Sequence, residues 1–239
     1  MEKIKIIAKK ELNSSFNSPI AYIIIILFLV VSGWFFTNTL FPQGTVSMRG
    51  VFENIIVHLV LLIFAAAVSM RTFSEEKKSG TIELLLTKPI KDFDLVLGKY
   101  FAALILVVFT FVPTLIYVIS FKIFALGPLD IGSIIGAYLG LILISALYIS
   151  IGIFVSSLTE NQVVSFIVSF LIILVLFILN KILVFVPTGL ISVSEYLSSD
   201  YHFMNLSRGV LDSRDIIYFL SGVGIMLLLT KTSLESRKW

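Results

Sequence analysis

The stretch Ile131–Thr159 reads IGSIIGAYLGLILISALYISIGIFVSSLT and contains no Asp, Glu, Lys or Arg. A helix needs roughly 20 apolar residues to cross about 30 Å of hydrocarbon. Inside a bilayer the backbone N–H and C=O groups must be paired within the protein, and a helix pairs them all within one segment. The stretch is long enough for a complete crossing, so it predicts a membrane-spanning helix.

Five further stretches have the same character. Trimming their polar ends gives six candidate helices, near Ile20–Phe41, Val51–Met70, Tyr100–Ile123, Ile131–Ser156, Val163–Val186 and Asp215–Lys231. The second and the sixth are short, and we expect each to recruit a flanking polar turn. Pro113 predicts a kink in the third. The predicted fold is an all-α polytopic membrane protein with six transmembrane helices, forming a single domain over residues 1–239.

The composition agrees with this prediction. Of the 239 residues 58% are hydrophobic and 14% are charged, whereas soluble domains carry about 25% charged residues. A soluble domain of this length would have too much surface for so few charges. The composition excludes a soluble enzyme, a disordered chain and a nucleic-acid binder, despite a net charge of +3. The chain has no cysteine, which excludes disulfides, thiolate metal sites and Cys nucleophiles.

The distribution of Lys and Arg predicts the orientation, because cytoplasmic segments of membrane proteins carry an excess of both. With the N-terminus inside, thirteen of the eighteen Lys and Arg residues fall in cytoplasmic segments. The other side keeps Arg49, Lys122, Lys181, Arg208 and Arg214. We expect both termini to face the cytoplasm.

The N-terminal residues 1–19 predict an amphipathic helix at the membrane interface. Its apolar stripe includes Ile7, Ala8 and Leu12, and its lysines suit an anionic lipid surface. Ser18 and Pro19 end it before the first span. Two interpretations stay open: a plain anchor on the bilayer, or a helix that moves with the gate of a transporter.

Residues 71–99, between the second and third spans, read RTFSEEKKSGTIELLLTKPIKDFDLVLGK. Gly80 breaks the chain, and Thr81 can cap a following short helix with Glu83 in its first turn. That helix carries several leucines and stops before Pro89. Exposed apolar surface of this kind usually marks a partner site. The alternative is a loop that folds back onto the membrane surface.

Two smaller motifs concern helix ends and helix packing. Thr159 and Gln162 are three residues apart and predict a capping box at the start of the fifth span. Gly132, Gly136 and Gly140 repeat every four residues and predict a smooth face on the fourth span, against which another helix can pack closely.

Few ionisable groups lie at membrane depth, where they are often functional. His58 lies inside the second span, and we expect it to be a hydrogen-bonded packing residue rather than a proton relay. Glu53, Lys122 and Lys181 lie near span ends and are expected to snorkel. No chain of acids crosses the membrane, which argues against a carrier driven by protons or sodium.

Motifs for covalent chemistry are missing from the sequence. It contains no GxxxxGK[ST] phosphate loop, no HExxH zinc motif and no GxSxG elbow. Its paired carboxylates, Glu75 and Glu76, lie in a charged segment rather than a pocket. We therefore expect no catalytic site, no metal site and no bound cofactor, and we expect energy for uphill work to come from another polypeptide.

The segment Phe73–Pro89, FSEEKKSGTIELLLTKP, together with VLGKY at 96–100, resembles the coupling region of type-2 ABC transporter permeases. FNSPIAY at 16–22 is similar to the family's entry into the first span. SSLTENQ at 156–162 and SRGVLDSRDIIYF at 207–219 resemble one subgroup, the gliding-motility-associated permeases of Bacteroidota-type bacteria. The permease of the nitrous-oxide-reductase maturation transporter is the alternative within the family.

The resemblance implies a bacterial inner-membrane permease that pairs with a second half, as a homodimer or heterodimer, and binds two copies of an ATPase. ATP and Mg would be held by that ATPase, with a further membrane or periplasmic component also implied. The coupling helix would lie between the second and third spans, and residues 187–214 would form an extracytoplasmic loop. The implied ATPase contacts are Arg71, Glu75, Glu76, Lys77, Gly80, Thr81, Glu83, Leu84, Leu85, Pro89, Thr159, Glu160 and Asn161.

Three functions, each of a different class, are compatible with these observations. The first is the membrane subunit of an ATP-driven exporter. The second is a subunit whose ATP cycle drives assembly or signalling by mechanical transmission, without carrying a solute. The third is a solo channel or carrier, which the scarcity of intramembrane charge disfavours.

Overall fold

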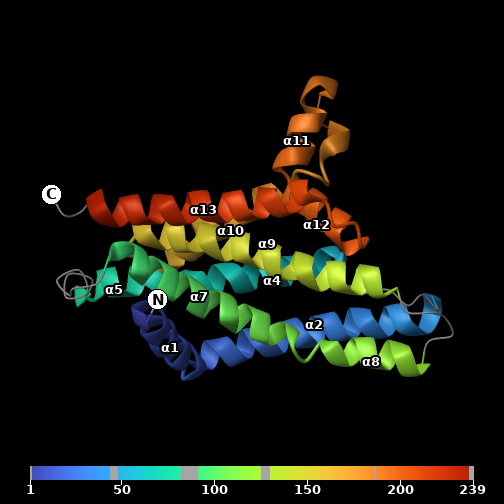
Figure 1. Ribbon diagram of the computed structural model, residues 1–239, viewed down its shortest axis with the longest axis horizontal. Coiled ribbons are helices and arrows are strands. Elements are labelled where there is room, and N and C mark those ends of the chain that lie inside the picture. The colour runs from blue at the N-terminus through green and yellow to red at the C-terminus, as the bar shows by residue number, and fades with distance from the viewer. Residues whose placement is uncertain (1, 44–47, 82–90, 125–129, 186, 237–239) are drawn as a thin grey trace.

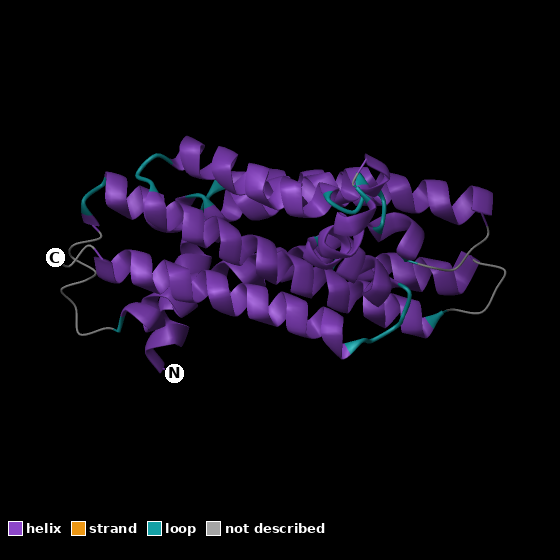
Figure 2. Ribbon diagram, turned by 90° about the horizontal axis from the view of Figure 1, so that it is seen from above, coloured by secondary structure: helices purple, strands orange, loops and turns teal. Residues whose placement is uncertain are grey.

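The computed structural model describes residues 2–43, 48–81, 91–124, 130–185 and 187–236. Within these ranges all the regular structure is helical and no strand occurs (Figure 2). The α-helices are α1 (Glu2–Phe16), α2 (Pro19–Gln43), α3 (Arg49–Phe52), α4 (Ile55–Ser69), α5 (Arg71–Lys78), α7 (Asp92–Phe111), α8 (Leu115–Phe124), α9 (Ile131–Leu158), α10 (Gln162–Ile178), α11 (Ile191–Leu197), α12 (Ser199–Ser207) and α13 (Ser213–Glu235). Two short 3₁₀ turns, Leu183–Phe185 and Thr188–Leu190, precede α11.

Most of the long helices run side by side along the long axis of the molecule, and the α11 region projects sideways from them (Figure 1). Five helical stretches in the described chain are long and apolar enough to cross a membrane: Ala21–Asn38, Ile55–Lys78, Asp92–Phe124, Ile131–Leu158 and Ser213–Glu235. The fifth predicted span corresponds to α10, which has 17 residues and is shorter than these. The count of six spans therefore stays a prediction.

The second and sixth spans extend into flanking polar residues, as expected: α5 continues α4 to Lys78, and α13 runs from Ser213 to Glu235. The third span begins at Asp92 rather than Tyr100, since polar residues form the first turns of α7. The predicted interruption at Pro113 is confirmed: α7 ends at Phe111 and α8 begins at Leu115.

Local sequence explains where several helices begin. Proline opens α2, at a helix position where its missing N–H costs nothing. The side-chain oxygens of Asn54, Asp130, Ser198 and Asp212 accept hydrogen bonds from backbone N–H groups in the first turns of α4, α9, α12 and α13. These caps satisfy groups that the helix itself leaves unpaired.

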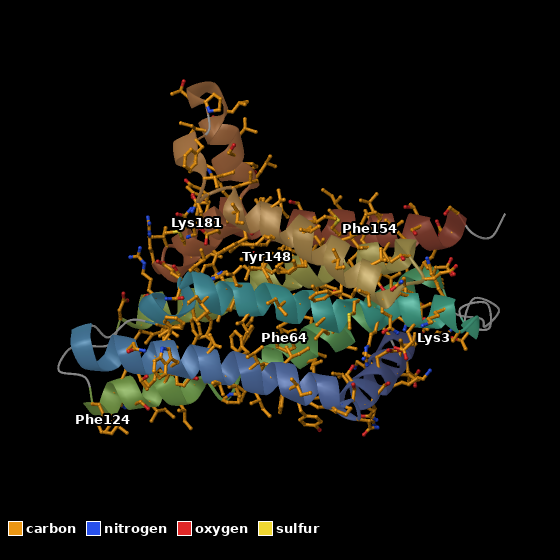
Figure 3. All side chains as sticks on the ribbon, turned by 180° about the vertical axis from the view of Figure 1, so that it is seen from behind. Lys3, Phe64, Phe124, Tyr148, Phe154 and Lys181 are labelled. Atoms are coloured by element: carbon orange, nitrogen blue, oxygen red, sulfur yellow. The ribbon has the colours of Figure 1, made fainter. Side chains whose placement is uncertain are left out.

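α9 forms the centre of the bundle. In its apolar stretch 78% of the residues are buried, against 22% for α2 and for α13. It packs against α4, α10, α12 and α13, and Tyr148 and Phe64 are fully buried in this interior (Figure 3). Close packing depends on small residues: a side chain at Gly152 would place its Cβ 2.6 Å from the Cβ of Ser69 on α4. The apolar stretches of α2 and α13 are left mostly exposed.

The predicted glycine face on α9 contacts α12 of the same chain. A Cβ at Gly136 would overlap the carbonyl oxygen of Leu206, and a Cβ at Gly140 would lie 3.0 Å from Cδ2 of Phe203. Gly132 lies against the backbone of Gly209, which has a φ of +83° and ends α12. The glycine face therefore contacts part of residues 187–214, the segment expected to form an extracytoplasmic loop.

The predicted amphipathic helix is present as α1, and it packs mainly on α7. A Cβ at Gly98 of α7 would lie 2.7 Å from the Cβ of Ile7, so this contact requires glycine. Asn17 and Ser18 form the turn that separates α1 from α2. The apolar stripe of α1 is therefore used, at least in part, for contact with another helix of the bundle.

Candidate functional site

One end of the bundle brings together α1, α5, the start of α7, the end of α9 and the start of α10 (Figure 1). We call this the α5 end. Residues 71–78 form a helix, α5, because Met70 continues directly from α4 into it. Arg71, Glu75 and Glu76 line the same cavity, whereas Lys77 points to the end of α9.

Lys99 joins three helices at the α5 end. Its Nζ lies 3.0 Å from Oε1 of Glu11 on α1 and 2.7 Å from Oε1 of Glu76 on α5. The lysine side chain is 2% exposed, and its ammonium also lies 5.4 Å from the ring centre of Phe73. A buried ammonium requires such partners, since burying a charge alone is costly. Lys99 belongs to the VLGKY motif at 96–100, but its link to Glu11 could not be predicted, because no local pattern relates residues 88 positions apart.

Ser156 joins α5 to the end of α9. Its Oγ accepts hydrogen bonds from the backbone N–H groups of Phe73 and Ser74, both at 3.0 Å, and donates to the carbonyl of Met70 at 3.0 Å. One hydroxyl thus satisfies the backbone at the junction of α4 and α5, where the first N–H groups of a helix have no helical partner. All of these groups are buried or half-buried.

Lys77 makes the second link between α5 and α9. It is buried, and its Nζ donates to the carbonyl of Ser157. The same carbonyl accepts a hydrogen bond from Ser233 Oγ of α13 at 3.3 Å. The last turn of α9 is therefore tied to α5 on one side and to α13 on the other.

The turn between α9 and α10 lies beside α5, which contacts both helices. The predicted capping box is wrong. Thr159 is the C-cap of α9, and Asn161 is the N-cap of α10, accepting from the N–H groups of Val163 and Val164. Glu160 is exposed in this turn. The helix begins two residues later than an N-cap at Thr159 would require, because α9 extends to Leu158.

Gly80 ends α5 with a φ of +68°, a left-handed conformation that favours glycine. Thr81 is exposed, and its Oγ1 lies 2.8 Å from Ser79 Oγ. The predicted coupling helix, including Glu83, Leu84, Leu85 and Pro89, lies outside the described residues.

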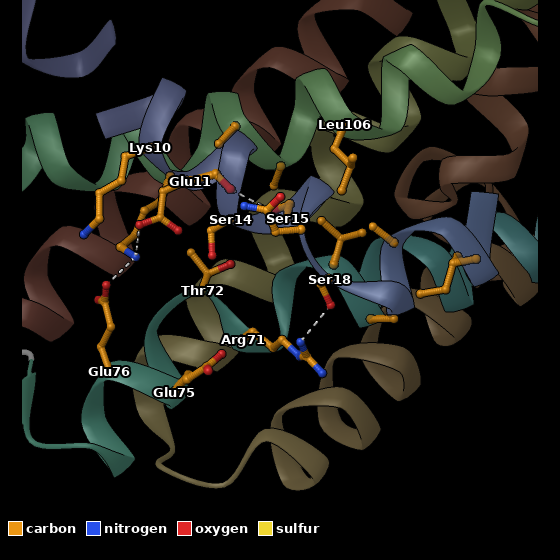
Figure 4. Close-up of a pocket in the computed structure, with 18 of the residues that line it drawn as sticks. Lys10, Glu11, Ser14, Ser15, Ser18, Arg71, Thr72, Glu75, Glu76 and Leu106 are labelled. Atoms are coloured by element: carbon orange, nitrogen blue, oxygen red, sulfur yellow. Dashed lines mark hydrogen bonds and ion pairs between the residues drawn. The ribbon is translucent and has the colours of Figure 1, made fainter. Parts of the chain in front are cut away.

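A cavity of about 470 Å³ opens at the α5 end between α1, α2, α4, α5 and α7 (Figure 4). The Arg71 side chain extends across it toward Ser18, with 3.4 Å between Nη1 and Oγ. The Nε of Arg71 is buried and has no hydrogen-bond partner in the described part of the chain. The polar lining comes from α1, α5 and Lys99 (Lys10, Glu11, Ser14, Ser15, Asn17, Ser18, Arg71, Thr72, Glu75, Glu76, Ser79, Thr81 and Lys99), and the apolar lining from α2, α4 and α7 (Ala21, Ile24, Ala67, Val68, Ala102, Ala103 and Leu106).

At the opposite end of the bundle two charged groups near predicted span ends have partners within the protein. Glu53 pairs with Arg49 at 2.7 Å and accepts a hydrogen bond from Ser207. Lys181 pairs with the buried Asp200 at 2.8 Å. Two of these partners, Ser207 and Asp200, belong to α12, and the third, Arg49, belongs to α3.

A second polar cluster at that end was not predicted. His202 Nδ1 lies 2.5 Å from Oδ1 of Asp215, and Nε2 lies 2.9 Å from the carbonyl oxygen of Tyr196. The imidazole is stacked on the ring of Tyr218, with 4.0 Å between ring centres. Because both ring nitrogens are engaged, this cluster holds α11, α12 and α13 together.

His58 is a packing residue, as predicted, but not a hydrogen-bonded one. It is 1% exposed, stacks on Phe177 at 5.2 Å and meets Phe203 edge-on at 4.6 Å. Within the described residues neither ring nitrogen has a hydrogen-bond partner at normal geometry. The same residues contain no group of three or more His, Cys, Asp or Glu that could hold a metal ion.

The family described as ABC-2 family transporter protein matches residues 5–230. The match covers both polar ends of the bundle and begins within α1. No curated protein matches the chain.

Proposed function

Because the chain belongs to the ABC-2 family of transporter proteins, we propose that it is an export permease driven by ATP hydrolysis on a separate ATPase subunit. Family membership makes it a multi-pass membrane permease subunit of an ABC transporter, without catalytic activity of its own. The proposal adds the direction of transport, the separate ATPase and the place where that ATPase acts. ATP and Mg would be bound by two copies of the ATPase, and two permease halves would form the path.

The observation that carries the proposal is the way α5 is fixed to its neighbours. Ser156 and Lys77 tie it to α9, and Lys99 ties it to α1 and α7. α5 is followed by Gly80, with a φ of +68°, and then by the segment that carries the other implied coupling residues. A displacement applied to that segment would move α5, and α5 would carry α1, α7 and α9 with it, since packed elements shift as units rather than deform.

The implied ATPase contacts have different surroundings in the structure. Glu76 and Lys77 are turned inward to Lys99 and to α9, so we assign them a positioning role. Arg71 and Glu75 line the cavity at the α5 end, and the exposed Gly80 and Thr81 remain contacts for the ATPase. The resemblance adds Glu83, Leu84, Leu85 and Pro89 to these contacts, with Thr159, Glu160 and Asn161 as a second, smaller contact.

The subgroup and the location are also part of the proposal. The resemblance of residues 156–162 and 207–219 supports a gliding-motility-associated permease, in the inner membrane with both termini in the cytoplasm. This orientation would place the α5 end, with its lysines and the exposed turn of Glu160, on the side where ATP is available.

The test is a pull-down of the tagged chain from native membranes in mild detergent. We expect wild type to recover a P-loop ATPase, and we expect Glu83→Lys and Leu85→Glu to lose it while still inserting into the membrane. Glu195→Lys, on α11 at the opposite end, is the matched control and should recover the ATPase as wild type does. Undiminished recovery and ATPase activity with both coupling variants would contradict the proposal.

A further inference from the structure

The cavity at the α5 end has two chemically different parts. Its polar part comes from α1, α5 and Lys99, and it includes the hydroxyls of Ser14, Ser18 and Thr72 (Figure 4). Its apolar part consists of residues such as Ala21 and Ala67, which belong to membrane-spanning stretches. Such a lining fits a molecule with a polar head and an apolar tail. The volume of about 470 Å³ lies within the range of small-molecule sites, about 300–1,000 Å³.

Arg71 is the group in this cavity that calls for an anionic ligand. Glu75 is four residues further along the same helix, a spacing that permits an ion pair, as Arg49 and Glu53 show elsewhere in the chain. Arg71 instead extends toward Ser18, forms no ion pair among the described residues and leaves its buried Nε without a partner. A guanidinium binds phosphate through two parallel hydrogen bonds, so a phosphate here would satisfy it.

The other charges that line the cavity indicate the net charge of the head group that carries the phosphate. Lys99 is already neutralised by Glu11 and Glu76. The lining contains three basic and three acidic residues, so it is balanced as it stands. A head group with no net charge preserves this balance, whereas an anionic one disturbs it. Glu75 lies one helical turn from Arg71, about 6 Å between Cβ atoms, where it can face an ammonium while Arg71 holds the phosphate.

We propose that this cavity binds a membrane phospholipid with a phosphate and a primary amine in its head group. Arg71 holds the phosphate, Glu75 faces the amine, and the start of an acyl chain lies along the alanines of α2, α4 and α7. The bound lipid connects α1 to the α5 segment through its head group. This inference does not depend on the ATPase or on transport, since it concerns the purified chain alone.

The test measures lipid binding to the full-length chain by native mass spectrometry in mild detergent. The probes are phosphatidylethanolamine, phosphatidylglycerol, diacylglycerol and inorganic phosphate. We expect wild type to bind phosphatidylethanolamine about tenfold more tightly than phosphatidylglycerol, and to bind neither of the other two. Equal binding of the two phospholipids would overturn the assigned head group. Equal binding of diacylglycerol, or phosphate binding as tight as lipid binding, would overturn the lipid site itself.

Three variants examine the separate contacts. Arg71→Gln should lower the affinity for phosphatidylethanolamine at least tenfold, and Glu75→Gln should abolish the preference over phosphatidylglycerol. Ala67→Phe should block binding by filling the apolar part while every charge remains, so it tests the site even if Arg71→Gln does not fold. Arg214→Gln, exposed at the opposite end, is the control. Wild-type binding by folded Arg71→Gln or by Ala67→Phe would overturn the proposal.

Discussion

Replacement of Lys99 by methionine tests whether the buried ammonium holds the α5 end together. Methionine has nearly the length of lysine and fills the same space, but it carries no charge. In Lys99→Met the carboxylates of Glu11 and Glu76 lose the cation that lies 3.0 Å and 2.7 Å from them. These two carboxylates come from α1 and α5, so the variant should weaken the contact between those helices.

The size of the effect follows from the geometry. Two like charges about 6 Å apart repel by roughly 3 kcal/mol at an effective dielectric constant of about 20. Removing one partner of a buried ion pair costs about 3–5 kcal/mol. The side chains of Glu11 and Glu76 are 26% and 17% exposed, so solvent screens part of this and the lower value applies. A loss of about 3 kcal/mol lowers the melting temperature of a chain of this size by roughly 6–12 °C.

The measurement is thermal unfolding of the purified variants in one detergent. Lys10→Met, at an exposed lysine of the same cavity, is the control and should change the melting temperature by less than about 2 °C, as expected for a surface site. The deficit of Lys99→Met should shrink as the pH falls, because protonation of one carboxyl removes the repulsion. Adding Glu11→Gln and Glu76→Gln should recover most of the loss. Equal melting temperatures for Lys99→Met and Lys10→Met, or no recovery in the triple variant, would refute the reasoning.

Three other predictions concern packing, the buried histidine and topology. Gly98→Ala should detach α1 from α7, because the new Cβ would lie 2.7 Å from the Cβ of Ile7. Cysteine cross-linking of α1 to α7 should therefore fall. Gly224→Ala, whose Cβ would meet nothing within 4 Å, should leave the cross-linking unchanged. His58→Phe should preserve ATPase recovery and activity, because a phenyl ring can still stack on Phe177. His58→Ala should have at most a modest effect on activity. Complete loss of activity in either variant would identify His58 as a functional histidine. A reporter fused to the C-terminus should be active on the cytoplasmic side, and a periplasmic signal would contradict the proposed topology.

The sequence allowed the helical class and most of the spans to be predicted, because a long apolar run has one stable structure in a bilayer. Span ends were harder. α7 begins at Asp92 and α5 continues to Lys78, although these segments are polar. Their charged side chains are tolerated in helices because Lys77 and Lys99 find partners on other helices. Hydropathy measures the preference of a residue for lipid and does not register such partners.

The candidate site was predictable in its position but not in its contacts. The motif from Phe73 to Pro89 located it, and the resemblance named the family that the comparison then identified. The links that fix α5 join residues 23 to 88 positions apart, and they use single serine and lysine side chains. Nothing in the local pattern distinguishes Ser156 from the many other serines in the apolar helices. Contacts of this kind depend on the three-dimensional packing of the whole bundle.

The most direct test of the account is the composition of the complex formed by the tagged chain in native membranes. The account predicts that a P-loop ATPase is recovered with wild type, that Leu85→Glu loses it, and that Glu195→Lys retains it. A further membrane chain in the same eluate would identify the second half as a heterodimer partner. Recovery of the chain alone in several mild detergents, with no ATPase associated, would contradict the claim that a separate ATPase drives this permease.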